Sequence, residues 1–185
     1  MVNGIDFRQT WLWRQAFLTP RSDCAVEEQE FFRTQYMLLR ERGAQLVFRI
    51  AADMSEMTVH DISHSDALWD TASLVAEGAV NVNPAEAFVL GASILLHDAA
   101  MSLAAFPGGL EEIKNTTAWK DAVACYGLIA GESQAVNSNL NPEKTTQQIL
   151  PNVLRQLHAE HAEQLAEQAW RSSDGSVAYL IEDSD

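Results

Sequence analysis

Residues 88–106 read FVLGASILLHDAAMSLAAF, and this apolar stretch decides how the rest of the chain is organised. A helix that is apolar on all sides is normally buried, so the stretch predicts a central helix of the core. A histidine and an aspartate, His97 and Asp98, stand side by side in its middle. Burying an ionised carboxylate without compensation is costly. We therefore expect Asp98 to be held by residues from elsewhere in the chain or by a metal ion.

The other four histidines form two close pairs, His60 with His64 and His158 with His161. The i, i+4 spacing of the first pair places both rings on one helix face. The second pair follows Arg155, and the three residues are spaced at intervals of three. They therefore form a row of neighbouring side chains on a later predicted helix. Our hypothesis is that some of these histidines close on the His-Asp pair around a metal ion. The alternatives are a hydrogen-bonded pair without metal and histidines on solvated helix faces.

Composition limits the possible functions. At 185 residues and 47% hydrophobic content, the chain suits one domain, or one domain with a small extension. The 26 acidic and 12 basic residues give a formal charge of −14, which argues against an extended nucleic-acid surface. A small nucleotide is still possible, because a metal offsets its charge. Cys24 and Cys125 lack metal-motif spacing and favour a reduced, cytoplasmic protein.

The apolar stretch from Ala87 to Phe106 is long enough to cross a bilayer. However, His97 and Asp98 would then lie near the membrane centre, where the aspartate alone costs roughly 3 kcal/mol. No basic loops flank the stretch, and the first residues lack the apolar core of a signal peptide. We therefore expect a core helix and no membrane association.

The periodicity of apolar residues predicts an all-α fold with helices over residues 5–18, 26–52, 59–78, 84–106, 110–130 and 145–170. Asn83 is a natural N-cap and Pro84 a natural first helical residue. We expect a break near residues 115–117, a loop over 131–142 and a bend at Pro151. The predicted organisation is an N-terminal helical extension (1–25), a helical domain (26–171) and an acidic C-terminal tail (172–185).

The spacing of His64 and the His97-Asp98 pair resembles the HD superfamily of metal-dependent phosphohydrolases. That family has a histidine on one helix, an adjacent His-Asp pair on a later helix, and a distal aspartate. Here His64 opens the segment HSDALW, and the pair follows 33 residues later within ILLHDAA. No motif marks the distal aspartate, for which Asp174 and Asp183 are candidates by position alone.

A closer resemblance is to the HD-CE branch, which occurs fused to chaperone-like ATPase modules in bacterial proteins. Residues 58–65, TVHDISHS, match its Thr-x-His-x-x-x-His-Ser string. Residues 154–159, LRQLHA, resemble its Leu-Arg-x-x-His element. The similarity extends roughly from Phe31 to Trp170.

This resemblance implies an HD-domain-like helical bundle that holds one or two divalent metal ions, from among Mn, Mg, Fe, Ni and Zn. It implies hydrolysis of a phosphate ester, with a nucleotide as the expected substrate, by a metal-activated water. The metal ligands that it implies are His64, His97 and Asp98. The supporting residues are His60, His158 and His161 for a second metal or the phosphate, Arg155 for phosphate charge, and Asp61 or Asp66 as base or support.

Two alternatives stay open. In the first, the chain is a catalytically weak or inactive HD-derived module that binds metal or nucleotide and regulates a larger protein or complex, such as a fused or partner ATPase module. The unplaced distal aspartate favours this alternative. In the second, the chain is a di-iron oxygenase, because some HD relatives use the same ligands for oxygen chemistry. The intact set of His64, His97 and Asp98 favours the hydrolase.

Overall fold

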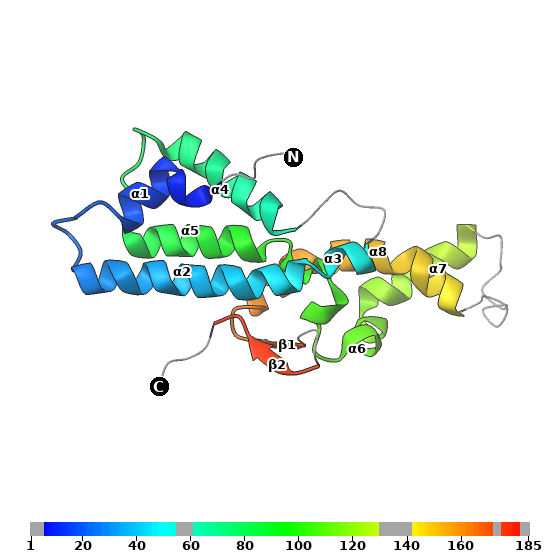
Figure 1. Ribbon diagram of the computed structural model, residues 1–185. Helices are drawn as coiled ribbons and strands as arrows, with labels where there is room; N and C mark the ends of the chain where they lie inside the picture. The colour runs from blue at the N-terminus through cyan, green and yellow to red at the C-terminus, as the bar shows by residue number, and fades with distance from the viewer. Residues whose placement is uncertain (1–5, 55–60, 130–141, 172–174, 182–185) are drawn as a thin grey trace.

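The computed structural model describes residues 6–54, 61–129, 142–171 and 175–181 (Figure 1). Its α-helices are α1 (Trp11–Phe17), α2 (Val26–Val47), α3 (Ile50–Asp53), α4 (Ile62–Ala76), α5 (Pro84–Leu96), α6 (Gly109–Asn115), α7 (Thr117–Ile129) and α8 (Pro142–Gln164). Three 3-10 turns accompany them, η1 (Phe7–Gln9), η2 (Ala99–Met101) and η3 (Leu103–Ala105). The predicted all-α fold is confirmed. No helix of the described residues is long and apolar enough to span a bilayer.

Helices α2 and α5 lie side by side and, with α1 and α4, form what we call the larger lobe, while α6, α7 and α8 form the smaller lobe (Figure 1). Gly91 on α5 allows this close approach, because an added Cβ would overlap the Tyr36 ring and lie 2.8 Å from Trp69. Both aromatic side chains are buried, and their ring centroids are 5.2 Å apart. The packing therefore requires the smallest side chain at position 91.

Helix α1 is fastened to α4 by two long-range hydrogen bonds. The Trp69 indole Nε1 donates to Thr10 Oγ1 at 3.0 Å, and the Leu12 backbone N–H donates to Ser73 Oγ at 2.9 Å. Leu12 and Trp13 belong to the same buried cluster as the residues of α2 and α5. The division of the chain at residue 25 stays a prediction.

Helix α5 begins as the sequence predicts. Asn83 accepts a hydrogen bond from the Glu86 backbone N–H, and the Glu86 carboxylate accepts one from the Asn83 N–H, both at 2.9 Å. Pro84 occupies the first turn, where its missing N–H has no helical acceptor to lose. This reciprocal capping box fixes the entry of the chain into the core.

The prediction that this helix continues to Phe106 is wrong. Helix α5 ends at Leu96, and His97 is its C-cap rather than a residue of its middle. The His97 side chain causes part of this ending, because Nδ1 donates to the Ile94 carbonyl at 2.7 Å. The chain then continues as the two 3-10 turns, in which Ala99, Ala100 and Ala105 are fully buried. Apolar content predicted the burial of the segment after Asp98, but it predicted neither the helix length nor the exposure of Val89 and Leu90, which are 61% and 36% exposed on α5.

Two other helix boundaries differ from the prediction. The helix expected over residues 26–52 ends at Val47, and the short α3 follows it. The last helix ends at Gln164 rather than Trp170, and it continues through Pro151. The break expected near residues 115–117 is confirmed, because Thr116 lies between α6 and α7 and its Oγ1 accepts from the Trp119 N–H at 3.1 Å. The loop expected over 131–142 lies outside the described residues apart from Pro142.

A short antiparallel hairpin of strands β1 (Ala169–Arg171) and β2 (Val177–Tyr179) follows α8. No alternating pattern predicted it. Leu180 after β2 is 1% exposed, and its carbonyl accepts a hydrogen bond from Arg42 Nη1 at 3.2 Å. The hairpin is thereby attached to α2.

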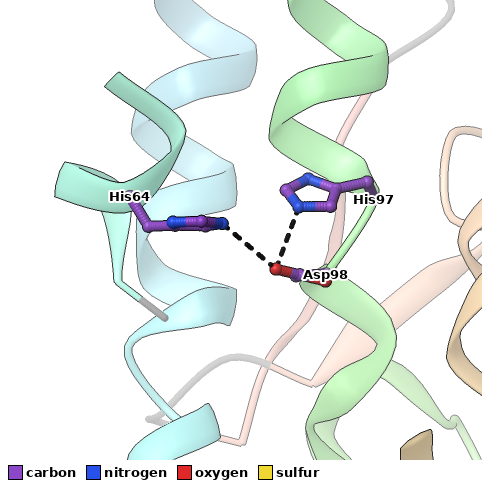
Figure 2. A group of neighbouring side chains, drawn as sticks. All are labelled: His64, His97 and Asp98. Atoms are coloured by element: carbon purple, nitrogen blue, oxygen red, sulfur yellow. Dashed lines mark ion pairs between the residues drawn. The ribbon is translucent and has the colours of Figure 1, made fainter. Parts of the chain in front are cut away.

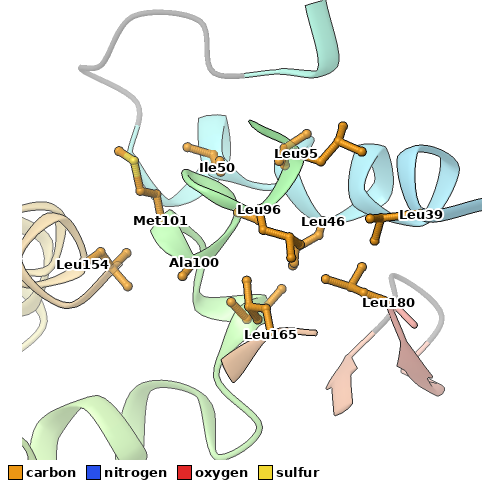
Figure 3. Close-up of a cluster of buried hydrophobic side chains, with 14 of the residues drawn as sticks. Leu39, Leu46, Ile50, Leu95, Leu96, Ala100, Met101, Leu154, Leu165 and Leu180 are labelled. Carbon is orange, nitrogen blue, oxygen red and sulfur yellow. The ribbon is translucent and has the colours of Figure 1, made fainter. Parts of the chain in front are cut away.

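A buried cluster joins α2 and α5 to α8 and the hairpin (Figure 3). Its members come from distant parts of the chain, and they include Leu39, Leu46, Leu95, Met101, Leu154, Leu165 and Leu180. The turn η2 packs against α8 and lies at the centre of this junction. The segment that follows the His-Asp pair is therefore held firmly between the two lobes (Figure 1).

Candidate metal centre

The first turn of α4 carries His64. Asp61 is the N-cap of this helix, and its carboxylate accepts hydrogen bonds from the Ser63 backbone N–H at 2.9 Å and from the Ser63 hydroxyl. The Ser63 hydrogen bonds lower the pKa of Asp61 below its usual range. A charged N-cap of this kind fixes the start of a helix. It therefore fixes the position of His64, three residues after Asp61.

His64 points toward the His97-Asp98 pair at the end of α5 (Figure 2). Nε2 of His97 lies 2.9 Å from Oδ2 of Asp98, and Nε2 of His64 lies 3.5 Å from the same oxygen. One ligand atom from each residue lies within 4.8 Å of the other two. Two ligands that each bind a metal at about 2.1 Å are separated by about 3.0–3.4 Å at right-angle or tetrahedral geometry. The two distances to Asp98 Oδ2 are close to these values.

The hydrogen bonds of His97 indicate that a proton or a cation lies between His97 Nε2 and Asp98 Oδ2. Nδ1 donates to the Ile94 carbonyl, so a neutral imidazole carries its lone pair on Nε2. This lone pair faces Asp98 Oδ2 at 2.9 Å, a contact that only a second proton or a cation makes favourable. In the metal-free protein the hydrogen bond to Asp98 raises the pKa of His97 above its ordinary value. A metal ion would replace that proton.

The hydrogen bond from His97 Nδ1 to the backbone carbonyl also fixes the orientation of the His97 ring. In metal sites, the histidine nitrogen that does not bind the metal is commonly held by a hydrogen bond in this way. The side chains of His64 and His97 are 35% and 38% exposed, whereas that of Asp98 is 15% exposed. The site is thus open to solvent on the histidine side. Two imidazole nitrogens and one carboxylate oxygen suit Mn, Fe, Ni, Zn or Mg and leave coordination positions for water and substrate. The residues present fit a divalent cation.

The structure does not bring His158 or His161 into this ligand group. His161 is buried, its Nε2 donates to the Ala105 carbonyl at 2.9 Å, and its ring stacks on Phe106 with centroids 4.0 Å apart. Nδ1 of His158 donates to the Arg155 carbonyl within α8. The involvement of these two residues in a second metal or phosphate site stays a prediction.

Arg155 is exposed on α8 and lines a hollow that α8 forms with α3. Its predicted contact with phosphate is not tested by the geometry. Asp66 is paired with Arg40 through two hydrogen bonds of 2.6 and 2.9 Å. Its carboxylate is therefore engaged by this pair and is not part of the metal group. Three further candidates, His60, Asp174 and Asp183, lie outside the described residues.

Sequence reasoning missed two groups that support the centre. One is the Ile94 carbonyl, which orients His97. The other is Asp53, whose Oδ2 accepts from the Ser102 hydroxyl at 2.8 Å and from the Leu103 N–H at 2.9 Å. Asp53 thereby holds the chain four residues after Asp98. The i, i+3 spacing of Ile94 and His97 was an available signal, whereas nothing local indicated Asp53.

This helical scaffold, with a histidine opening one helix and a His-Asp pair closing another, defines an HD domain. The family model of HD-CE matches residues 54–185, and the chain belongs to this family. The comparisons with curated proteins and with solved structures gave no match.

Proposed function

We propose that this protein is a metal-dependent phosphohydrolase that acts on a phosphate ester, with a nucleotide as substrate. The observation that supports this function is the convergence of His64, His97 and Asp98, with the His97 lone pair directed into the group. Membership of the HD-CE family supports it independently. We also propose a cytoplasmic location, which the two free cysteines support.

A divalent ion bound by these residues would supply Lewis-acid chemistry, lowering the pKa of water and polarising the phosphate. His64 and His97 would each offer it an imidazole nitrogen, and Asp98 would offer a carboxylate oxygen. Arg155 is the proposed guanidinium for the phosphate, because its planar fork matches phosphate oxygens. Asp61 has a lowered pKa and accepts hydrogen bonds from Ser63, which suits a charged support of α4 better than a proton acceptor at neutral pH.

The second candidate is a module that binds metal or nucleotide and regulates a fused or partner ATPase module without turnover. One observation favours it. Within the described ranges, the metal group contains three protein ligands, and no distal aspartate joins them. Three ligands bind a cation with open positions but do not by themselves establish turnover.

Metal content tests the first proposal directly. Elemental mass spectrometry would compare the parent protein with Asp98→Ala, and with Asp121→Ala as a control at an exposed aspartate of α7. We expect near-stoichiometric metal in the parent and control and a loss in Asp98→Ala. A panel of nucleotides with added Mn would follow. Metal with turnover supports the hydrolase, and metal without turnover supports the regulatory module. A folded parent without metal after incubation with Mn or Fe contradicts both metal-dependent roles.

A further inference from the structure

A surface patch of apolar side chains lies where α2 and α5 run side by side, and we call it the α2–α5 patch (Figure 1). It consists of Phe31, Phe32, Phe88 and Val89. The ring centroids of Phe31 and Phe32 are 5.4 Å apart, and those of Phe32 and Phe88 are 5.8 Å apart, so the three rings form one contiguous row. Phe31 is 50% exposed and Val89 is 61% exposed. The patch is therefore open to solvent.

The sequence of α5 explains why this surface is apolar. The helix buries Ala87, Gly91 and Leu95 in the core. A second apolar row follows the spacing i, i+3, i+4 and i+7, which places four side chains on one flank of the helix. Its members are Ala85, Phe88, Val89 and Ala92. All four are exposed or half-buried, so the described part of the chain covers this flank only in part.

Helices α2 and α5 run parallel to each other. The Phe32 ring contacts the Phe88 ring, and one turn further along both helices an added Cβ at Gly91 would overlap the Tyr36 ring. The first turns of the two helices are therefore neighbours, and the α2–α5 patch lies just beyond them.

Negative charge gathers at this end of the two helices. Glu27 and Glu28 stand in the first turn of α2, and Glu86 stands in the first turn of α5. All three are exposed, and among the described residues none of them forms an ion pair with a basic side chain. Residues 50–113, which include all of α5, contain no lysine or arginine.

The basic residues nearest to the patch in the sequence already have carboxylate partners. Arg33 pairs with Glu30 on α2. Arg21, in the connection before α2, has a side chain that is 8% exposed and pairs with Asp23 at 2.7 Å. The α2–α5 patch thus keeps an excess of negative charge beside it, which a basic ligand would offset.

The sign of this charge distinguishes the possible partners. A second copy of the chain, related by a two-fold axis, would bring the same carboxylates toward one another, which is unfavourable. A membrane surface is anionic and attracts basic helices, so it would repel this patch. A partner that has basic residues beside an apolar face is complementary in both respects. A patch that spans two parallel helices suits a third helix, whose apolar side chains pack between theirs.

We propose that the α2–α5 patch is the docking surface for a basic amphipathic helix of a partner protein. The large apolar residues of that helix pack on the row of phenylalanine rings, and its lysines or arginines lie beside Glu27, Glu28 and Glu86. This role is independent of the metal centre, to which no residue of the patch belongs.

Fluorescence anisotropy with a labelled peptide tests this proposal on the full chain. The probe is a peptide of leucine and lysine, about 18 residues long, with all leucines on one helix face. The same pattern with glutamate in place of lysine is the control peptide. We expect the Leu/Lys peptide to bind the parent, with an affinity that falls as the salt concentration rises from about 0.05 to 0.3 M. The Leu/Glu peptide should not bind.

Two matched variants show whether the peptide binds at the patch. The patch variant, Phe31→Gln/Val89→Gln, lacks the two most exposed side chains of the patch and should bind the peptide about tenfold more weakly. The control variant, Leu74→Gln/Val75→Gln, changes two apolar residues of α4 that are 66% and 75% exposed, and it should bind as the parent does. All four positions are exposed, so folding is little affected.

A third variant, Glu27→Gln/Glu28→Gln, should bind more weakly and with a smaller dependence on salt. The proposal is overturned if the Leu/Lys peptide does not bind the parent, if the patch variant binds it as the parent does, or if the control variant weakens binding equally. Asp98→Ala should bind the peptide like the parent, so failure of the proposed function is recognised separately.

Two further results would assign the patch to another occupant and overturn the proposal. One is a dimer of the parent, seen by analytical ultracentrifugation, that the patch variant dissociates. The other is sedimentation of the parent, but not of the patch variant, with vesicles of phosphatidylcholine and phosphatidylserine. We expect neither.

Discussion

Nε2 of His64 lies 3.5 Å from Oδ2 of Asp98, although α4 and α5 bring the two residues together from different parts of the fold. His64 stands in the first turn of its helix and Asp98 just beyond the end of the next. The distance between them therefore depends on how α4 and α5 pack, and not on any local turn. A cation bound between the two residues should stabilise that packing.

Binding of Mn or Ni should raise the melting temperature of the protein. At a free metal concentration about 100 times Kd, the stabilisation is about 2.7 kcal/mol, or about 5–10 °C for a chain of this size. Differential scanning fluorimetry with and without metal measures this shift, and a chelator should reverse it. His64→Ala should fold and lose the metal-dependent shift. An equal shift in His64→Ala would show that the metal binds elsewhere.

The metal-free protein should lose stability as the pH rises through the pKa of His97. The adjacent Asp98 raises this pKa in the folded state above the unfolded value of about 6.5. The extra stability is therefore fully present below about pH 6.5 and is lost as the pH rises through the higher, folded-state pKa.

Urea unfolding between about pH 5.5 and 8.5, with a chelator present, measures this dependence. His97→Gln should show a flatter profile, because it lacks the titrating group. The metal-loaded protein should show the opposite slope, since its ligands must lose their protons to bind the ion. Stability of the metal-free parent that rises over this range would contradict the prediction.

Gly91→Ala should destabilise the larger lobe by about 2–3 kcal/mol or more. The added Cβ overlaps the Tyr36 ring and lies 2.8 Å from Trp69, and both rings are confined by other buried aromatic side chains. Gly43→Ala on α2 is the matched control. Nothing lies within 4 Å of a Cβ added there, so helix propensity should make it stabilising by up to about 1 kcal/mol. Chemical denaturation should give the two changes opposite signs.

Arg40→Met should cost about 3 kcal/mol. Arg40 forms two hydrogen bonds to Asp66, whose side chain is 12% exposed, and its guanidinium lies 4.6 Å from the centre of the Phe7 ring. Removing one partner leaves the Asp66 charge nearly buried without compensation.

The double variant Arg40→Met/Asp66→Leu should cost less than the two single changes added together. Urea denaturation of all four proteins gives the coupling energy. Arg33→Met is the control, because Arg33 and Glu30 form a solvent-exposed pair whose loss should cost less than about 1 kcal/mol. Additive costs at Arg40 and Asp66 would show that the pair is not coupled.

The parts of the fold predicted from sequence are those that local chemistry decides. Asn83, Pro84 and Glu86 form a capping box from neighbouring residues, so the start of α5 needed no tertiary information. The same holds for the His-Asp pair and for His64, whose residue types and placement indicated a common site. Burial of the alanine-rich segment after Asp98 also followed from composition.

The parts that sequence reasoning missed depend on contacts between distant residues. The apolar pattern continues through position 97, so it gives no sign that α5 ends there. The structure shows this end through the hydrogen bond of His97 and through the hydrogen bonds that Asp53 accepts from Ser102 and Leu103. The contact of His161 with the Ala105 carbonyl, 56 residues away, is likewise a long-range contact that no local pattern indicated. The hairpin strands have three residues each, too few for an alternating pattern to be recognised.

The hydrogen bonds between α1 and α4 affect where this chain can be truncated for expression. The family match begins at residue 54, but the face of α5 that Gly91 opens is covered by α2, and α4 is attached to Thr10 and Leu12. A truncated protein starting at residue 54 would lack the Tyr36 and Trp13 rings and the Thr10 hydroxyl that contact Trp69. The segment recognised by sequence comparison thus omits residues that pack against it in this structure, and expression designs need to retain α1 and α2.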